Sequence, residues 1–299
     1  MLNQLFARFD EAEVEYKRNV NMSALSTAGV GGIASAVAYP TNDEEFVWVI
    51  KLLRTLKIKY KVIGRMSNIL PSDNGFDGVL VSTRRFSRIS HSDDAVSAEC
   101  GATLASVISY AARNSLGGAE ELFGIPGTVG GAAYSNAGAY GREFSDFFID
   151  GRIYFPSENV IKTLKRRDIN FGYRESAFSK KEAYLLSSRL RFLKTNAEEI
   201  RAKISEIRTK RQLTQPLMLP SLGSTFKRGS FGSAARLIDS LGLKGTSVGG
   251  ACISSKHAGF IVNMGNATSA DFKSLIRLIE DRVFSEYGVA LEKEIEYLN

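Results

Sequence analysis

The chain has 299 residues, of which 44% are hydrophobic and 24% are charged, and its formal net charge is +7 at pH 7. This length is long for a single hydrophobic core, so we expect a globular protein with two or three lobes. The basic residues are dispersed and lack the aromatic signature of RNA-binding modules, which disfavours nucleic-acid recognition and fits ligands that carry phosphates and carboxylates. No apolar run is long enough to span a bilayer, and the N-terminus lacks the features of a signal peptide, so we expect a cytoplasmic protein without a membrane partner.

The two cysteines, Cys100 and Cys252, lie in apolar, strand-like stretches. Their spacing matches no metal site, and a single histidine beside a lysine, as at His257, does not make one either. We therefore expect buried free thiols, a reducing compartment and no bound metal.

The N-terminal half alternates between helical and strand patterns. The predicted elements are, in chain order, an amphipathic helix at 1–20, a tight loop at 21–32, a strand at 37–40, a helix at 46–53, strands at 61–63, 79–81 and 95–100, and a helix at 104–114. Asn42 and Glu45 form a capping-box pattern before the second helix. The loop at 64–70 follows a strand and contains small and amide residues, which makes it a candidate phosphate cradle; a structural turn is the alternative interpretation.

A long glycine-rich stretch, residues 124–141, carries no charge and consists mostly of small side chains. Its glycines let the backbone adopt unusual conformations and let a ligand approach closely, while Pro126 stiffens the turn. Residues 130–135 can start a short helix whose free N–H groups face back toward the loop, an arrangement suited to a pyrophosphate. The alternative interpretation is a tight buried crossover between packed strands.

The C-terminal half contains the remaining predicted elements. They are strands at 147–155 and 185–192, a helix from 195 to about 212 that marks the passage between lobes, a helix at 233–241, strands at 251–254 and 260–263, a helix at 269–287 and a last strand at 289–297. Thr195 and Glu198 form the cap of the first of these helices, and Gly288 stops the last one.

Two polar segments in this half are candidates for chemistry. Residues 171–178 are polar and aromatic, which is unusual for a mere connector. The last predicted strand carries Glu292, Glu294 and Glu296 on one face, because side chains alternate along a strand. Without a function, residues 171–178 would be a simple connector and the last strand would be a solvated edge strand.

Seven groups of motif residues follow one another along nearly the whole chain. They are Gly64 with 67–70; 124–131 with 136–141; 173–178; 223–227; 237–239 with 242–245; 254 with 256–258 and 260–263; and 291–295. In this order they resemble the motifs of the UDP-N-acetylenolpyruvoylglucosamine reductase family, the flavin reductases of bacterial peptidoglycan precursor synthesis. The compact length and the short segment after Arg174 resemble the family's shorter class, which lacks an inserted substrate-covering loop.

The resemblance implies an α+β fold: a two-lobed FAD-binding domain of the vanillyl-alcohol-oxidase/PCMH type, followed by a C-terminal α+β substrate-binding domain. We expect the lobes at 1–80 and 81–195 and the substrate domain at 196–299, whose last strand can return to the FAD domain. The family's reaction uses non-covalent FAD and NADPH as co-substrate. A hydride passes from flavin N5 to the enolpyruvyl methylene carbon of UDP-N-acetylglucosamine enolpyruvate, which gives UDP-N-acetylmuramate after protonation.

The resemblance also implies three catalytic residues. Arg174 would stabilise the enolate-like charge on the substrate carboxylate, because a guanidinium stays charged and binds two carboxylate oxygens. Ser224 would give a proton to the carbon that bears the ether oxygen, and Glu294, in protonated form, would help to stabilise the intermediate. Without the motifs, Arg174 would be interpreted as half of a structural salt bridge with Glu175, and Ser224 as part of a turn or helix cap.

Ligand contacts follow from the same resemblance. Contacts with FAD are expected at Gly64, Arg65, Met66, Ser67, Asn68, Ile69, Leu70, Gly124, Ile125, Pro126, Gly127, Thr128, Gly130, Gly131, Ala132, Asn136, Ala137, Gly138 and Tyr140. Contacts with the substrate are expected at Tyr173, Lys227, Arg228 and His257. The adjacent cations Lys227 and Arg228 suit the paired phosphates of a nucleotide sugar.

The sequence departs from the family pattern at a few positions. Arg65 and Met66 occupy places where the family usually has glycine, which either alters the approach of the backbone to the FAD phosphates or brings a cation to them. Gly229 and Lys293 stand where proline is usual, and Ala28 replaces a bulkier residue. None of these changes removes a catalytic residue, so we expect an active enzyme.

Three other functions compete with this one. A flavin oxidase of the same fold that acts on a hydroxy acid or a sugar often tethers FAD through a histidine in the glycine loop, and this loop has no histidine. A non-catalytic flavin-binding protein would not need the three catalytic residues together. A nucleic-acid partner would show a strongly salt-dependent affinity. The family's usual state also leads us to expect a monomer.

Overall fold

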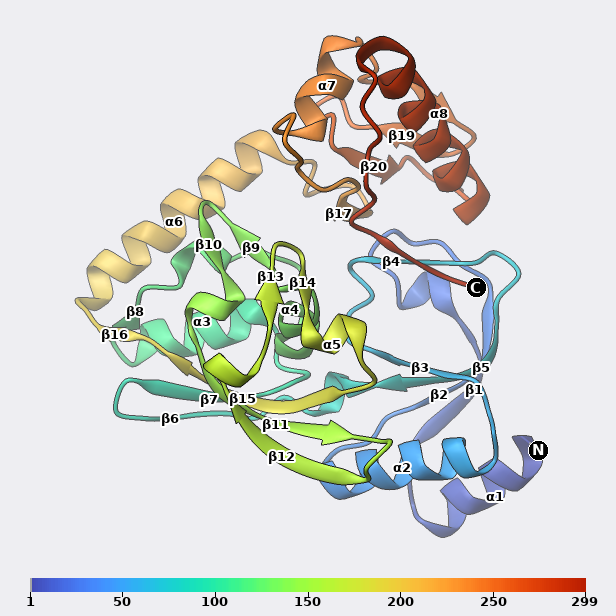
Figure 1. Cartoon of the computed structure of the whole chain (residues 1–299), viewed down its shortest axis with the longest axis vertical. Coiled ribbons are helices and arrows are strands. Elements are labelled where there is room, and N and C mark those ends of the chain that lie inside the picture. The colour runs from blue at the N-terminus through green and yellow to red at the C-terminus, as the bar shows by residue number, and fades with distance from the viewer. Residues whose placement is uncertain (1) are drawn as a thin grey trace. The chain divides into compact units, whose positions relative to one another are not determined.

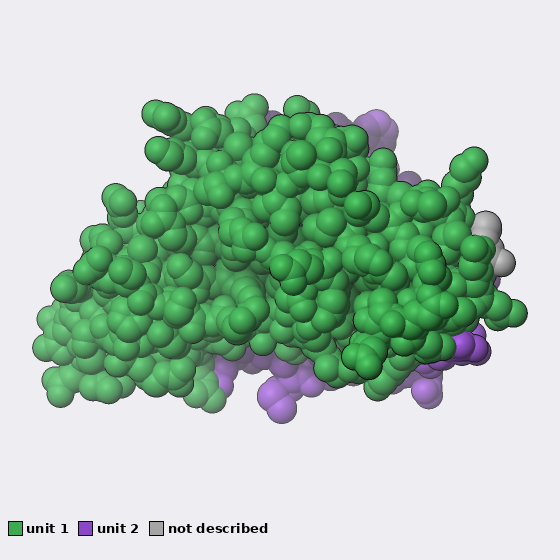
Figure 2. Space-filling model, turned by 90° about the horizontal axis from the view of Figure 1, so that it is seen from below, with its two compact units in different colours: residues 1–17, 36–65, 78–209 green, residues 18–35, 66–77, 210–299 purple. Residues whose placement is uncertain are grey.

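The computed structural model describes residues 2–299, and its helices and separate sheets form an α+β fold (Figure 1). The chain forms two compact units, each discontinuous in sequence. Unit 1 contains the residues up to 17, 36–65 and 78–209, and unit 2 contains residues 18–35, 66–77 and 210–299 (Figure 2). The division into domains at residues 80 and 195 stays a prediction.

The larger sheet of unit 1 is antiparallel and has the strand order β12-β11-β15-β7-β6. Its strands are β6 (Ile89–Ser92), β7 (Ala95–Glu99), β11 (Phe148–Phe155), β12 (Val160–Lys165) and β15 (Tyr184–Arg191). Helices α3 (Leu104–Arg113) and α4 (Val129–Ser135) share one hydrophobic core with this sheet (Figure 1). In that core Val107, Val129 and Ile153 are at most 1% exposed. Helix α4, which lies within the glycine-rich stretch, is therefore fixed against the sheet.

Another sheet has the order β1-β2-β5-β3, and β3 runs parallel to β5. Its strands are β1 (Tyr16–Asn21), β2 (Ile33–Ala38), β3 (Tyr60–Ile63) and β5 (Phe76–Ser82), and the helices beside it are α1 (Leu2–Glu11) and α2 (Asp43–Thr55) (Figure 1). Phe9, Phe46 and Tyr154 lie fully buried in the core that these helices help to form. Strand β3 therefore leaves a buried sheet where the loop at 64–70 begins.

Unit 2 is built on the antiparallel sheet β17-β20-β19-β18. Its strands are β17 (Ser221–Ser224), β18 (Ser247–Val248), β19 (Ala251–Ile253) and β20 (Phe260–Asn263), and its helices are α7 (Ala234–Ser240) and α8 (Ser269–Tyr287). Ile238, Phe272 and Leu275 are at most 1% exposed in their common core. A separate parallel pair, β4 (Ile69–Pro71) with β21 (Glu296–Leu298), ties the loop at 64–70, the first glycine loop, to the C-terminal segment.

The remaining elements are short, apart from one long connecting helix. They are β8 (Leu116–Gly117), β9 (Gly138–Ala139), β10 (Arg142–Glu143), β13 (Phe171–Gly172), β14 (Glu175–Ser176), β16 (Leu193–Lys194), α5 (Ala177–Lys180), the long α6 (Ala197–Thr214), and 3₁₀ turns at Met22–Ala24, Thr83–Arg85, Glu120–Leu122, Phe144–Asp146 and Arg166–Asp168.

Most predicted helix caps are confirmed. The Asn42 side chain accepts the Glu45 main-chain N–H at 2.9 Å at the start of α2. Helix α8 begins and ends where predicted, and Gly288 closes it in the left-handed conformation. The cap of α6 is wrong by one residue, because Asn196 rather than Thr195 accepts the N–H of Glu198.

Two predicted elements are too long. The lead-in helix ends at Glu11, and strand β1 starts at Tyr16, because Glu13 adopts a left-handed backbone with φ 54° and reverses the chain. The strand predicted at 289–297 is regular only at Glu296–Leu298. Its earlier part lies beside residues 225–227, and this pairing has no local sequence signal.

Both cysteines are free thiols. Cys100 is buried as predicted, and burial raises the pKa of its thiol to about 12, so it is unreactive in the folded protein. Cys252 is only half-buried, and the prediction is wrong for that residue. Within residues 2–299, no helix combines the length and apolar character that crossing a bilayer requires.

Candidate active site

The N–H groups at the start of helix α4 already donate to acceptors within the protein. Its first two N–H groups, on Val129 and Gly130, donate at 2.8 Å to the carbonyls of Ala102 and Cys100, and the Gly131 N–H donates to the Thr128 side chain at 3.2 Å. The prediction of free N–H groups at this helix end is therefore wrong. The carbonyls come from the turn between β7 and α3, and a sequence pattern gives no sign of that neighbour.

The loop at 64–70 offers donors instead. The main-chain N–H groups of Arg65, Met66 and Ser67 donate to no acceptor in the part of the chain that the structure describes. Met66 has a positive φ of 50°, which turns the chain sharply at this point. Consecutive N–H groups in such turns can surround a phosphate oxygen. The loop at 64–70 therefore has consecutive N–H groups available for a phosphate.

Gly64 packs against the second glycine loop. A Cβ at this position would lie 2.6 Å from Thr128 Oγ1, so any side chain would force the two loops apart. Thr128 is only 1% exposed and also caps α4, which leaves it little freedom to move. The contact explains why the motif has glycine at position 64.

Arg84 is a candidate residue that the sequence analysis missed. Its Nε donates to the Gly64 carbonyl at 3.2 Å. Burial is the main cause that lowers the pKa of Arg84, and repulsion by the nearby Arg65 is the second. Two guanidinium groups therefore lie near the same loop. The departure at Arg65 therefore brings a cation to the loop. Arg84 belongs to no recognisable motif, so only the fold reveals it.

Arg174 lies in a tight hairpin of unit 1, where Gly172 of β13 pairs with Glu175 of β14. Its backbone is left-handed, with φ 55°, which costs a residue with a side chain on the order of 1 kcal/mol. The Nη2 atom donates to the Gly138 carbonyl at 2.8 Å, and the guanidinium lies 5.0 Å from the ring centroid of the exposed Tyr173. Strained backbone that surrounding contacts maintain is common at functional sites.

Asn136 supports this hairpin from the glycine-rich stretch. Its Nδ2 donates to the Gly172 carbonyl at 2.9 Å and to Glu143 Oε2 at 2.8 Å, and its Oδ1 accepts the Ser145 N–H at 3.0 Å. The residue is only 1% exposed. Its side-chain polar atoms therefore bind the protein, and the expected contact of Asn136 with FAD would have to come from its main chain.

In unit 2, Ser224 and Glu294 lie on two chain segments that pair with each other. The Glu294 N–H donates to the carbonyl of Thr225, the residue after Ser224, at 2.9 Å. One step further, the Lys227 N–H donates to the Glu292 carbonyl at 2.8 Å. Ser224 is exposed and Glu294 is half-buried. Two of the three predicted catalytic residues thus share one local structure, whereas Arg174 belongs to unit 1.

Asn68 connects the first glycine loop to the same segment. Its Nδ2 donates to the Glu294 carbonyl at 2.9 Å, and its own carbonyl accepts the Glu296 N–H at 2.9 Å. The parallel pairing of β4 with β21 continues directly from these bonds. The position of Glu294 therefore depends on the loop expected to bind the cofactor.

The expected substrate residues differ in their surroundings. The Lys227 ammonium lies 2.5 Å from Glu292 Oε1, so its charge is paired. The next residue, Arg228, lies at the surface. His257 Nδ1 accepts the Gly259 N–H at 3.1 Å. Burial lowers the pKa of His257, so its ring is neutral at pH 7 and offers a hydrogen bond rather than a charge.

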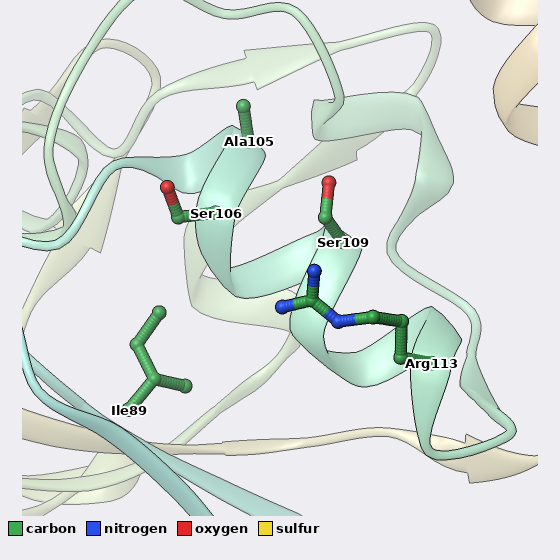
Figure 3. Close-up of a pocket in the computed structure, with 5 residues that line it drawn as sticks. All are labelled: Ile89, Ala105, Ser106, Ser109 and Arg113. Atoms are coloured by element: carbon green, nitrogen blue, oxygen red, sulfur yellow. The ribbon is translucent and has the colours of Figure 1, made fainter.

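An open pocket elsewhere in unit 1 is separate from these residues. It has a volume of about 270 Å³ and is lined by Ile89 of β6 and by Ala105, Ser106, Ser109 and Arg113 of α3 (Figure 3). None of the predicted site residues lines it. It provides a place for control substitutions away from the candidate site.

Two family profiles match separate parts of the chain. Residues 34–163 match a profile described as an FAD binding domain. Residues 215–298 match the C-terminal domain of UDP-N-acetylenolpyruvoylglucosamine reductase. The first match contains both glycine loops and the second contains Ser224 and Glu294.

Relatives extend this similarity over the whole chain. A protein from Caldicellulosiruptor saccharolyticus named UDP-N-acetylenolpyruvoylglucosamine reductase is 38% identical over 291 residues, which cover 97% of this chain and 94% of that protein. The chain belongs to the UDP-N-acetylenolpyruvoylglucosamine reductase family. A reductase of the same name from Clostridium botulinum is 37% identical and covers 96% of this chain and 94% of its own.

A solved structure agrees with the family assignment. The crystal structure of the reductase from Thermus caldophilus matches with a TM-score of 0.80 and 32% identity, over 96% of this chain and 99% of that one. The predicted fold class, an FAD-binding domain followed by a C-terminal α+β domain, is thereby confirmed for this reductase. Arg174 lies between the two profile matches, in a part of the chain that only the full-length similarity covers.

Proposed function

We propose that this reductase converts UDP-N-acetylenolpyruvoylglucosamine to UDP-N-acetylmuramate with Arg174, Ser224 and Glu294 as its catalytic residues. The observation that carries the activity is the 38% identity over 97% of the chain with a reductase of that name. The residue roles rest on the strained hairpin of Arg174 and on the pairing that joins the Ser224 and Glu294 segments.

The residues of the first glycine loop fit FAD. Gly64 has no room for a Cβ, three consecutive N–H groups at 65–67 are available, and two guanidinium groups lie close by. These features suit a diphosphate, because N–H groups and arginines both bind phosphate oxygens. FAD held there would supply hydride transfer between NADPH and the methylene carbon of the enolpyruvyl group.

Arg174 would hold the substrate carboxylate. One of its N–H groups is occupied by the Gly138 carbonyl, and this bond fixes the plane of the guanidinium. A planar fork binds both oxygens of a carboxylate and stabilises the negative charge that spreads onto it when the double bond is reduced. The half-buried position strengthens that interaction relative to open water.

Ser224 would supply the proton that completes the reaction. Its hydroxyl hydrogen passes to the carbon that bears the ether oxygen and the carboxylate, and the alkoxide then regains a proton from solvent. Because a hydroxyl is a weak acid, the transfer requires a strongly basic carbon and close contact. Glu294, on the adjacent segment, would donate a hydrogen bond in its protonated form to the same intermediate.

The expected substrate residues would hold the diphosphate and the sugar of the substrate. Tyr173 offers an exposed ring and Arg228 an exposed guanidinium. Lys227 would have to exchange its partner Glu292 for a phosphate. Lys227 and Arg228 would together supply the charge contact with the diphosphate. We also propose a cytoplasmic monomer without nucleic-acid or membrane partners.

The activity is tested with the purified holoprotein under anaerobic conditions. NADPH should bleach the flavin absorbance, and the enolpyruvyl nucleotide, added without oxygen, should restore it while UDP-N-acetylmuramate appears. A protein that contains no flavin, or whose reduced flavin ignores the enolpyruvyl nucleotide, would refute the proposal.

Gly64→Ala is expected to weaken FAD binding about tenfold, because the new methyl group collides with the capping residue Thr128 and overpacking of this kind typically costs about 1–3 kcal/mol. The measurement is an FAD titration of the apoprotein followed by flavin fluorescence, with the melting temperature recorded in parallel. An unchanged FAD affinity would mean that the two glycine loops do not cooperate in holding the cofactor.

A further inference from the structure

We propose that Asn136 is a positioning residue for the reaction, which holds the Arg174 hairpin in the conformation that binds the substrate carboxylate. The inference rests on the proposed function of Arg174. It concerns a residue whose motif suggests cofactor contact but whose side chain the structure assigns to another task.

Asn136 reaches the hairpin through a single directed bond. Its Nδ2 donates to the carbonyl of Gly172, the residue before the two-residue turn Tyr173-Arg174, at 2.9 Å. Nδ2 also donates its second hydrogen to Glu143, and Oδ1 accepts the N–H of Ser145. These two further partners orient the amide. With 1% exposure, the side chain is shielded from bulk solvent. The amide can therefore act as a fixed anchor for the turn.

Residues 134–138 hold the hairpin through two more contacts. The Ser176 hydroxyl, on the far side of the turn, donates to the Tyr134 carbonyl at 2.8 Å. The Arg174 guanidinium itself donates to the Gly138 carbonyl at 2.8 Å. The hairpin is thus held before the turn, after the turn and at the charged group, all by one short segment that comprises the end of α4 and the residues directly after it.

The backbone of Arg174 explains why an anchor is needed. Its left-handed φ of 55° is unfavourable for a residue with a Cβ, so an unrestrained turn would relax and move the guanidinium. Small displacements of a charge-stabilising group are costly, because such a group acts only at the correct distance from the developing charge. Loss of the Asn136 bond should therefore lower the rate of substrate reduction without affecting the reduction of FAD by NADPH.

Asn136→Gly is the sharpest test. Asn136 itself has left-handed dihedral angles (φ 44°, ψ 54°), which glycine adopts readily, so the substitution removes the amide and keeps the helix end. In anaerobic stopped-flow measurements we expect FAD content and the rate of flavin reduction by NADPH to stay within about twofold. We expect flavin reoxidation by the enolpyruvyl nucleotide to slow by about tenfold or more.

A matched control and a second variant complete the design. Ser135→Ala removes a neighbouring side-chain bond, from Ser135 Oγ to the Gly131 carbonyl, that does not involve the hairpin, and it should leave both half-reactions unchanged. Asn136→Asp keeps the acceptor for Ser145 but cannot donate to Gly172. It should reproduce the slow reoxidation even if the glycine variant proves unstable.

The double mutant with Arg174→Ala shows whether Asn136 acts by positioning Arg174 or by stabilising the protein in general. If Asn136 acts through Arg174, adding Asn136→Gly to Arg174→Ala should slow reoxidation by less than about twofold. Equal slowing in both backgrounds, or parallel loss of FAD and of both half-reactions, would overturn the inference. A wild-type protein whose flavin is not reoxidised by the nucleotide would instead refute the proposed function itself.

Discussion

Ser224→Ala is expected to slow the reoxidation of reduced flavin by the enolpyruvyl nucleotide by about 1000-fold, because a positioned proton donor typically contributes about 10²–10⁴-fold. The methyl group cannot protonate the substrate carbon, and water is a poorly placed substitute. Flavin content and reduction by NADPH should be unchanged, since neither step uses this proton. Anaerobic stopped-flow absorbance separates the two half-reactions.

The control for this variant lies on the same strand. Ser221→Ala changes a serine at the start of β17 that is outside the proposed proton path, and it should reoxidise its flavin at the wild-type rate. If Ser224→Ala were also to react at the wild-type rate, the proton would have to come from another group. Glu294, on the paired segment, would then be the first candidate.

Arg174→Lys is expected to lower kcat by about 100-fold or more while FAD content stays intact, because a lysine is a point charge and cannot replace a planar fork. The lysine also cannot reproduce the fixed guanidinium plane that the Gly138 carbonyl sets. Steady-state kinetics with saturating NADPH give kcat, and the visible spectrum of the purified variant gives the flavin content.

A comparable arginine away from the hairpin provides the control. Arg113→Lys lies in the open pocket on α3 and should retain full activity (Figure 3). Loss of flavin in Arg174→Lys, with activity falling in proportion, would identify Arg174 as a structural residue rather than a catalytic one.

The sequence predicted the parts of this reductase whose signals are local. Helix α8 was placed to the residue because its apolar residues recur at helical spacing and Gly288 stops it, and the motifs identified the segments that carry the candidate site. Edge strands such as β12 were missed, since most of its side chains are exposed and show no apolar alternation. Local signals of this kind therefore define buried elements better than exposed ones.

Long-range partners account for the remaining errors. The predicted anion site at α4 failed because the carbonyls of Cys100 and Ala102 reach its N–H groups from a different turn. Asn136 carries the same amide whether it contacts a cofactor or the carbonyl of Gly172, 36 residues away. Arg84 gained significance only when β5 and its following turn brought it to Gly64. Residue type indicates what a group can do, whereas the fold determines what it meets.

The bond between Asn68 and Glu294 joins residues that are 226 positions apart. During translation, the loop at 66–71 leaves the ribosome long before β21 exists to pair with it. That loop can reach its final arrangement only when residues 294–298 have emerged. Loading of the flavin should accordingly be a post-translational event, and nascent chains stalled before residue 294 should emerge colourless.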